Sequence, residues 1–362
     1  MTKLKDSFIL PCRVEIQNRI VKAAMSENMA DIGGRPSQKI FNLYKQWSQS
    51  GAGLLISGNV MIDSGAIGEP HNVVVESEKY LSELQKWAEL AQKHGSQLWM
   101  QINHPGRQAP LFNQTSVSAS DVELNIPGMI KRPRPLTEAE IHEIIERFGN
   151  TAAIAKKAGW KGVEIHGAHG YLVSQFLSSH TNKRTDQWGG ILENRARFAI
   201  EIYRNMRKKV GANFPIGIKI NSADFQKGGF TEEESLQVID MLSTEGVDLI
   251  EVSGGTYEMP AMMGGQQKES TLKREAFFLD FIVKARKRTK IPLLLTGGFR
   301  SKEVMEQALQ NNELDFVGMA RPFVLYPSFA NDIIGGKIDK ALIEQHDIFW
   351  FGAQLQQLAE GI

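Results

Sequence analysis

The sequence is poor in cysteine, in net charge and in long apolar runs. Its 362 residues contain one cysteine, Cys12, which excludes an internal disulfide framework and a cysteine-ligated zinc or iron–sulfur cluster within this chain. Lys and Arg number 42 and Asp and Glu number 41, so the net charge of +1 argues against a protein that binds nucleic acid by charge neutralisation. No apolar run approaches the ~18 residues of a membrane-spanning helix.

The N-terminal segment lacks the pattern of a secretory signal. Met1 to Asp6 begins with basic residues but contains no apolar stretch and no small-residue cleavage site. Together with the single cysteine, this predicts a cytoplasmic protein with neither a membrane nor a nucleic acid as partner. Hydrophobic residues make up 42% and charged residues 23% of the chain, so enough apolar material is present for a large core.

Short β-rich apolar runs alternate with amphipathic helical stretches. Strands are expected at 19–25, 54–57, 97–102, 162–166, 216–220, 247–252, 291–295 and 315–319. Helices are expected at 37–50, 78–94, 137–158, 192–210, from 231, at 275–288, at 301–309 and after 322. Thr137 with Glu140, and Thr231 with Glu234, have the spacing of capping boxes. Eight alternating units predict an α/β fold, a parallel sheet closed as a (β/α)8 TIM barrel, with an open doubly wound sheet as the alternative.

No linker interrupts the series, so one domain over 1–362 is expected. An N-terminal cap at 1–18 would contain a hairpin over 8–17 that closes the bottom of the barrel. A helical tail is expected at about 338–362. The Met- and Gly-rich segment 259–265 follows the sixth strand and either lines or covers a substrate entrance or serves as a mobile connector.

Polar residues stand at the C-terminal ends of the predicted strands, where TIM barrels place their active sites. The fourth strand ends in His166, His169 and Tyr171. Two imidazole N–H groups could hold one oxygen there, and the phenol could give up a proton. The same pattern would also fit a pair of satisfied loop histidines or an incomplete metal site.

Residues at the other strand ends suggest binding sites for a phosphate group and for a flat ring. Gly297 and Gly298 follow the seventh strand and Arg321 follows the eighth, where backbone N–H groups and a guanidinium can hold a phosphate. A tight turn would explain the two glycines equally well. Gln101 offers an amide to a ring imide, and Lys219 brings a cation, a combination that suits flavin mononucleotide. For Lys219 the alternative is an ion pair with Asp224 or another barrel acid.

These motifs resemble those of the Old Yellow Enzyme family of FMN-dependent ene-reductases, in the branch of the bacterial and fungal NADH:flavin oxidoreductases. The resemblance is strongest from His166 to Tyr171 and continues through 175–178, 182–190 and 193–195. The segments 18–21, 101–107 and 318–322 stand where the family has its other motifs.

The resemblance implies a single FMN-binding barrel that holds FMN non-covalently and uses NADPH or NADH to reduce a small activated alkene. No metal is implied, and a homo-oligomer is compatible with the pattern. The implied cofactor-binding residues are Ala23, Ala24, Met25, Ser26, Gly58, Gln101, Lys219, Gly297, Gly298, Ala320 and Arg321. His166 and His169 would hold the substrate oxygen, and Tyr171 would be the proton donor.

Three departures from the family pattern stand out. Ser26 replaces a threonine or cysteine, Asn28 lies near a substrate-contacting tyrosine of some relatives, and Ser179-His180 replaces a Pro-hydrophobic pair. Rival readings are a tRNA dihydrouridine synthase, a metal-dependent barrel hydrolase and a non-catalytic flavin-storage protein. The first would need a catalytic cysteine inside the barrel, the second needs more carboxylates and histidines at strand ends, and the third would not need Tyr171.

Overall fold

The structure is a computed structural model that describes residues 2–113, 115–124, 130–255, 278–341 and 348–361, without the side chains of 348–351. The predicted loop 259–265 lies outside the described residues. The start of the helix expected at 275–288 and residues 342–347 of the predicted tail also lie outside them.

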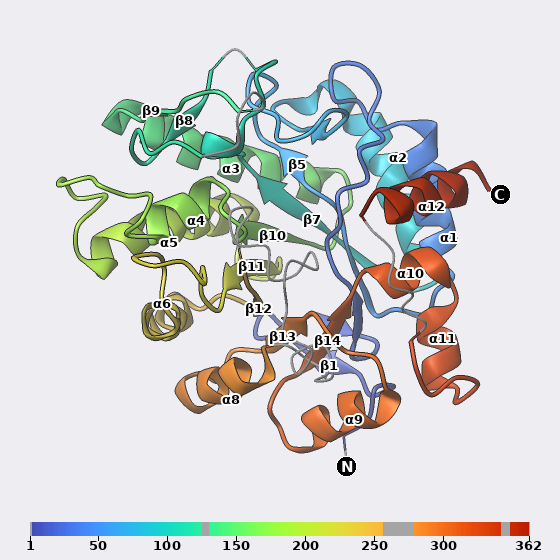
Figure 1. Cartoon of the computed structure of the whole chain (residues 1–362). Coiled ribbons are helices and arrows are strands. Elements are labelled where there is room, and N and C mark those ends of the chain that lie inside the picture. Colours follow the sequence, from blue (N-terminus) through green and yellow to red (C-terminus); the bar gives the residue numbers. More distant parts are fainter. Residues whose placement is uncertain (1, 114, 125–129, 256–277, 342–347, 362) are drawn as a thin grey trace.

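Eight parallel strands close into a barrel (Figure 1). In the order of the chain they are β3 (Ile20–Lys22), β4 (Leu54–Ile56), β7 (Gln97–Asn103), β10 (Gly162–Gly167), β11 (Ile216–Asn221), β12 (Leu249–Ser253), β13 (Leu293–Thr296) and β14 (Phe316–Met319). The sheet runs from β10 through β14 to β3, β4 and β7, and the pairing of β7 with β10 closes it. The predicted (β/α)8 barrel is confirmed, and the open sheet is excluded.

The helices fall where the sequence predicts them. They are α1 (Gln38–Trp47), α2 (Leu81–Gln92, after the 3-10 turn η1, Glu78–Tyr80), α3 (Glu138–Lys157), α5 (Leu192–Val210), α6 (Glu232–Glu245), α8 (Leu279–Arg288), α9 (Lys302–Gln310) and α10 (Arg321–Leu325). A further short helix, α11 (Phe329–Ile334), was not predicted. Both predicted capping boxes form, because the side chains of Thr137 and Thr231 each accept the backbone N–H of the Glu three residues later.

Several short elements were not predicted. They are β5 (Val60–Met61), β6 (Val73–Val74), η2 (Gly106–Gln108), β8 (Val117–Ser118), β9 (Arg134–Pro135) and α4 (Leu172–Leu177). An element of only a few residues is too short to show a repeating pattern of apolar and polar residues, so the sequence does not predict it.

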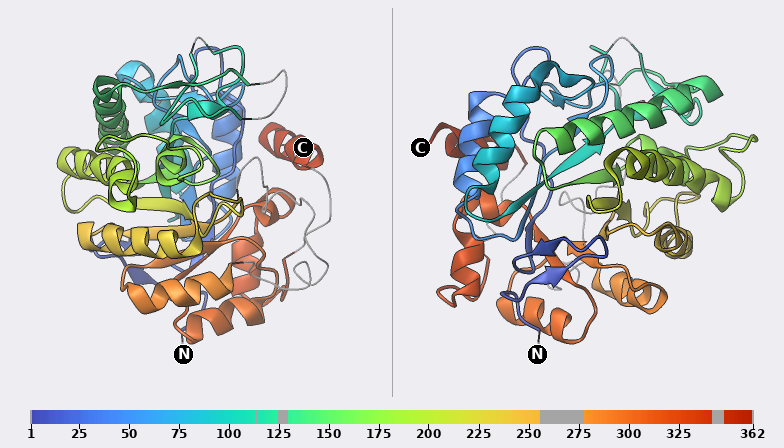
Figure 2. Two further views of the ribbon diagram at one scale, coloured as in Figure 1. Left: turned by 60° about the vertical axis from the view of Figure 1, so that its left-hand side comes forward. Right: turned by 180° about the vertical axis from the view of Figure 1, so that it is seen from behind.

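The chain termini cover the barrel from two sides. β1 (Phe8–Ile9) and β2 (Glu15–Ile16) form the predicted hairpin, and Figure 2 shows it in dark blue close to the N-terminus. Its Leu10, Cys12 and Ile16 pack against apolar residues of the barrel interior and so close one end. At the other terminus α12 (Ile348–Glu360) lies on α1, where Lys39 pairs with Glu360 at 2.8 Å. No helix in the described ranges has the length and apolar character needed to cross a bilayer.

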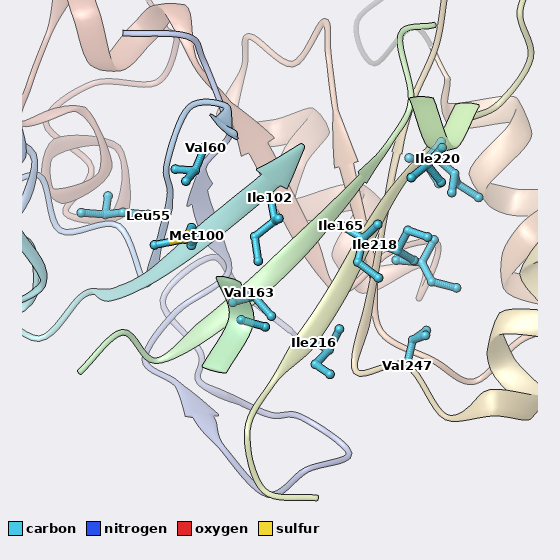
Figure 3. Close-up of a cluster of buried hydrophobic side chains, with 14 of the residues drawn as sticks. Leu55, Val60, Met100, Ile102, Val163, Ile165, Ile216, Ile218, Ile220 and Val247 are labelled. Atoms are coloured by element: carbon cyan, nitrogen blue, oxygen red, sulfur yellow. The ribbon is translucent and has the colours of Figure 1, made fainter. Parts of the chain in front are cut away.

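The barrel strands present opposite chemistry on their two faces. Val163 and Ile165 of β10, like Ile216 and Ile218 of β11, belong to the apolar layer that packs against the helices (Figure 3). The alternate residues of the same strands point into the barrel, as the two-residue repeat of a strand requires. This alternation brings the polar residues of the strand ends to the inside.

Trp99 fills the lower barrel and depends on two glycines of the neighbouring strands. The indole is fully buried in the inner apolar cluster. A Cβ on Gly162 would lie 2.5 Å from the Trp99 ring, and one on Gly217 would lie 3.2 Å from it. The missing side chains therefore make room for the indole, and Trp99 forms a floor beneath the polar end.

We predict that Trp99→Ala lowers the free energy of unfolding by about 3–5 kcal/mol, since it leaves a large cavity in the barrel interior. Urea denaturation followed by circular dichroism measures this loss. Phe112→Ala is the matched control, because Phe112 is 57% exposed and its removal is expected to change stability by no more than about 0.5 kcal/mol. Equal losses in the two variants would contradict the role of Trp99.

Candidate active site

The end of β10 brings the predicted histidines and tyrosine together. His166 lies on the strand, and Tyr171 is the N-cap residue of α4. Between them His169 and Gly170 take left-handed backbone angles, φ 60° and 78°, which reverse the chain. The ring centroid of His166 is 5.2 Å from that of His169 and 4.7 Å from that of Tyr171. The three side chains therefore form one cluster.

Hydrogen bonds orient the two imidazoles differently. The Ala168 N–H donates to Nδ1 of His166 over 3.3 Å, so the proton of a neutral His166 ring is on Nε2. Nε2 of His169 lies 2.8 Å from the hydroxyl of Ser253 on β12. His166 thus offers its Nε2–H to a ligand. His169 can offer Nδ1–H when Ser253 donates to its Nε2.

Both imidazoles are held neutral. Burial, followed by the neighbouring His169 and Lys219, lowers the pKa of His166 well below its usual value. Burial and Lys219 lower the pKa of His169 to about 3. Neutral rings are poor acids but good N–H donors, so the pair suits a carbonyl or phenolate oxygen.

Asn59 connects Tyr171 to the loop that follows β3. Its amide nitrogen donates to the Tyr171 hydroxyl over 3.2 Å and lies 3.4 Å from the hydroxyl of Ser26. The sequence places Asn59 at a strand end but gives no sign of this contact. The contact places an N–H donor against the phenol oxygen.

The loop after β3 differs from its prediction. The strand ends at Lys22 rather than at Met25, and Ala24, Met25 and Ser26 are partly exposed. Gly58 lies against this loop so closely that a Cβ on it would meet the Met25 carbonyl oxygen at 2.4 Å.

A buried carboxylate holds this loop in place. Glu27 accepts the Gly58 N–H over 2.9 Å and also the Tyr44 hydroxyl of α1. The segment Ala23–Ser26 is thereby fixed beside Gly58, at the predicted cofactor edge. Glu27 was not predicted, since nothing in the sequence pattern distinguishes it from a surface acid.

Inside the barrel, Gln101 and Lys219 each have an acidic partner. The Gln101 amide donates to Glu164 over 2.7 Å, and the Lys219 ammonium lies 2.9 Å from Glu251. The ion-pair alternative for Lys219 is therefore correct, with Glu251 and not Asp224 as the partner. Asp224 instead accepts the Ser178 hydroxyl over 2.6 Å.

The ends of β13 and β14 form a cationic, glycine-rich corner. Gly297 and Gly298 have φ of 123° and 88°, which a residue with a Cβ adopts only with strain. Partial burial and the nearby charge of Arg300 lower the pKa of Arg321. Two neighbouring guanidiniums repel each other less when a dianion lies beside them, so the corner fits a phosphate. Arg300 was not predicted, although it follows the glycine pair by two residues.

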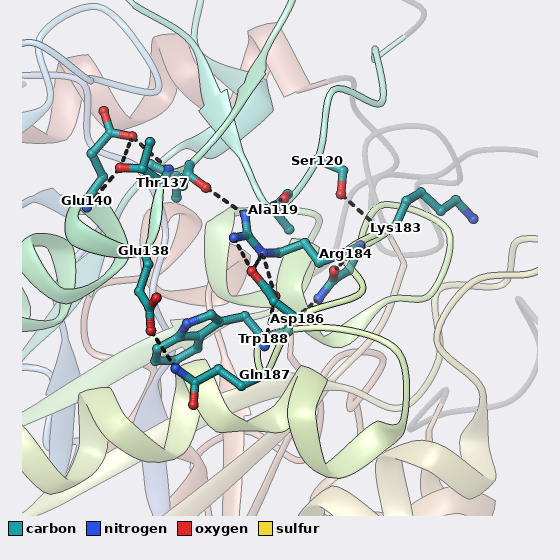
Figure 4. A network of polar contacts seen from close by, with 12 residues as sticks. Ala119, Ser120, Thr137, Glu138, Glu140, Lys183, Arg184, Asp186, Gln187 and Trp188 are labelled. Carbon is teal, nitrogen blue, oxygen red and sulfur yellow. Dashed lines mark hydrogen bonds and ion pairs between the residues drawn. The ribbon is translucent and has the colours of Figure 1, made fainter.

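Hydrogen bonds tie the loop that follows α4 to the segment before α3 (Figure 4). The Arg184 guanidinium pairs with Asp186 at 2.5 Å and donates to the Leu136 carbonyl oxygen over 2.6 Å. The Trp188 N–H donates to Asp186 over 3.0 Å. These contacts connect the loop to the segment just before α3.

The described residues contain no group of three or more His, Cys, Asp and Glu side chains arranged as metal ligands. Among those residues, the metal-hydrolase alternative thus has no candidate site. At the C-terminal end of the barrel, the amide of Gln101 and the ammonium of Lys219 on one side fit the ring of FMN, and the cationic corner on the other side fits its phosphate.

The sequence matches the model of the NADH:flavin oxidoreductase / NADH oxidase family over residues 11–339, and the chain belongs to this family. It is 38% identical over 345 residues to NADH-dependent flavin oxidoreductase iliE of Hypocrea jecorina, covering 88% of this chain and 85% of that protein. It is 29% identical over 355 residues to an NADH:acrylate oxidoreductase of Vibrio harveyi, covering 96% of this chain but 34% of that protein.

Solved structures agree on the architecture. A 2-naphthoyl-CoA reductase superposes with a TM-score of 0.90 at 26% identity, covering 99% of this chain and 57% of that one. An Old Yellow Enzyme homologue from Zymomonas mobilis superposes with a TM-score of 0.78 at 22% identity, covering 94% and 95%. The resemblance to the Old Yellow Enzyme family is confirmed, and with it an enzyme that uses FMN and NAD(P)H.

We predict that His166 and His169 stay neutral from about pH 8 to about pH 5, whereas free histidine titrates near pH 6.5. Nitrogen-15 NMR of histidine-labelled protein measures this directly. Because the unfolded chain binds protons below about pH 6.5 that the folded site refuses, stability should fall as pH drops from about 7 to about 5. Imidazolium signals from either residue at about pH 6 would contradict the assignment.

Proposed function

We propose that this enzyme is an ene-reductase that reduces the double bond of an α,β-unsaturated carbonyl compound or a similar activated alkene. The proposal is carried by the meeting of two neutral imidazoles and one phenol at the end of β10. This cluster lies at the same end of the barrel as the amide, ammonium and guanidinium groups that suit FMN. The acrylate-reducing relative supports a substrate with a conjugated carbonyl group.

The histidines bind and polarise the substrate. FMN, when bound, takes a hydride from NAD(P)H and supplies it to the β-carbon of the alkene. As the β-carbon is reduced, negative charge develops on the carbonyl oxygen. The N–H groups of His166 and His169 hold that oxygen, and a single preorganised donor of this kind contributes about 3 kcal/mol. Because the rings are neutral, they stabilise the charge without transferring a proton.

Tyr171 supplies the proton for the α-carbon. A phenol with a pKa near about 10 is protonated at neutral pH and therefore available as an acid. Asn59 stabilises the phenolate that remains, through its hydrogen bond to the Tyr171 oxygen. Solvent then restores the phenol proton before the next turnover.

The first test concerns the protein as purified. We expect a yellow protein whose flavin absorbance is bleached by NADH or NADPH under anaerobic conditions and restored by an enone such as cyclohexenone. A flavin that is reduced but never reoxidised by any activated alkene would favour the storage-protein alternative over the ene-reductase.

We predict that Tyr171→Phe slows alkene reduction on the order of 10²–10⁴-fold, because the general acid is lost, while reduction of the flavin by NAD(P)H stays nearly unchanged. Stopped-flow absorbance separates the two half-reactions. Tyr203→Phe is the control, since the Tyr203 hydroxyl bonds to the Gly246 carbonyl oxygen at the outside of the barrel. Equal slowing of both half-reactions would show that Tyr171 is not the acid.

We predict that the double variant His166→Ala, His169→Ala loses affinity for phenols, which place a partly negative oxygen where the substrate oxygen would lie. Loss of both N–H donors should weaken binding at least about 10²-fold. The long-wavelength charge-transfer band of the flavin–phenol complex measures the affinity. Unchanged affinity, with flavin content equal to that of the unaltered enzyme, would refute the clamp.

A further inference from the structure

Three charged residues lie inside the barrel between the floor and the strand ends. Glu164 on β10 and Glu251 on β12 are fully buried, and Lys219 on β11 is 3% exposed. Lys219 stands in register with Glu251 on one side and with His166 on the other. Buried charges are costly unless they neutralise one another, so this group must balance its own charge.

The hydrogen bonds point to one shared proton. Lys219 pairs with Glu251 at 2.9 Å, and Gln101 donates to Oε2 of Glu164 over 2.7 Å. Among the described residues, Oε1 of Glu164 and the Glu251 carboxylate have no other partner in good hydrogen-bonding geometry, although the Thr296 hydroxyl lies close to Glu251. Glu164 and Glu251 lie within hydrogen-bonding reach of each other, across β11. A proton held between the two carboxyl groups serves both and leaves one negative charge to balance the ammonium.

The electrostatics assign that proton to Glu164. Burial and the charge of Glu251 raise the pKa of Glu164 well above its usual value. Burial alone would raise the pKa of Glu251 as well, but Lys219 and the surrounding hydrogen-bonding groups hold it below the usual value. At neutral pH the triad therefore consists of a neutral acid, a carboxylate and an ammonium.

The other titratable groups around the triad are few. His166 and His169 face Lys219 from the open end and are neutral. Lys22 on β3 is fully buried on the helix side of the wall and interacts with both Lys219 and Glu251. Among the described residues, Glu164 and Glu251 are the acids whose pKa responds to Lys219, and of these two Glu251 carries the negative charge that a proton can neutralise.

We propose that Glu164, Glu251 and Lys219 form a proton-holding triad that takes up one proton whenever negative charge is placed on the cofactor beside Lys219. The inference rests on the proposed function, in which FMN binds with its ring next to Lys219. Glu251 is the group that gains the proton. Glu164 and Lys219 are positioning residues, because their charges and hydrogen bonds determine at which charge state of the cofactor Glu251 gains the proton.

Charge and atoms balance through the cycle. NAD(P)H delivers two electrons and one proton as a hydride, so the cofactor gains one negative charge. The Glu251 carboxylate takes one proton from water and becomes neutral, which leaves the Lys219 ammonium opposite the new charge. When the hydride passes to the alkene, Glu251 returns its proton to water, while Tyr171 separately protonates the α-carbon. The interior keeps the same net charge in both states.

The pH dependence of the flavin midpoint potential tests the coupling, since its slope counts protons taken up per two electrons. Spectroelectrochemistry of the holoenzyme between about pH 6 and about pH 8 should give a count near two, one carried by the hydride and one taken up by Glu251. Glu251→Gln should give a count near one. Glu245→Gln, which alters an outer ion pair with Arg204, should keep the count of the unaltered enzyme.

A count of one in the unaltered enzyme would overturn the triad while leaving the ene-reductase function intact, and this outcome needs no variant to fold. A protein that binds no FMN would instead fail the proposed function, and the coupling would fail with it.

Infrared spectroscopy of the purified protein tests the shared proton independently of turnover. The carbonyl stretch of a buried protonated carboxylic acid should be present throughout the same pH range, shift in D₂O and vanish in Glu164→Gln. Absence of this band from the unaltered protein would overturn the assignment.

Discussion

The pairing of β10 with β7 is the contact on which the rest of the site depends, because it closes the barrel. It places Glu164 beside Gln101 and sets the direction in which His166 points. It also brings Gly162 against Trp99, so that the floor and the polar layer above it are fixed by the same register. A slip of one residue would turn Val163 and Ile165 inward and carry both Glu164 and His166 out among the helices.

Periodicity and turn chemistry account for most of what could be predicted. The eight strands, their helices and the two capping boxes follow from local patterns of apolar and polar residues, which report on local backbone geometry. The cluster of His166, His169 and Tyr171 was also visible, since its members lie within six positions of one another. Its assembly needed only a strand followed by a tight reversal.

The side-chain contacts that the sequence did not predict depend on how strands far apart in the chain align with one another. Nothing near Lys219 in the sequence identifies Glu251 as its partner, because their pairing is set by how β11 aligns with β12. Asn59 and Tyr171 are likewise 112 positions apart and meet only when the barrel closes. Such contacts are consequences of the closed sheet, and a single sequence carries no local signal for them.

The backbone at His169 restricts how this site can change during evolution or engineering. Its left-handed conformation suits glycine best, followed by asparagine, aspartate and histidine, and penalises β-branched or bulky side chains. Of the tolerated residues, only asparagine keeps a neutral N–H donor in place of the imidazole. Position 169 is therefore expected to hold either histidine or asparagine. Variation in substrate range is expected to arise at the other strand ends.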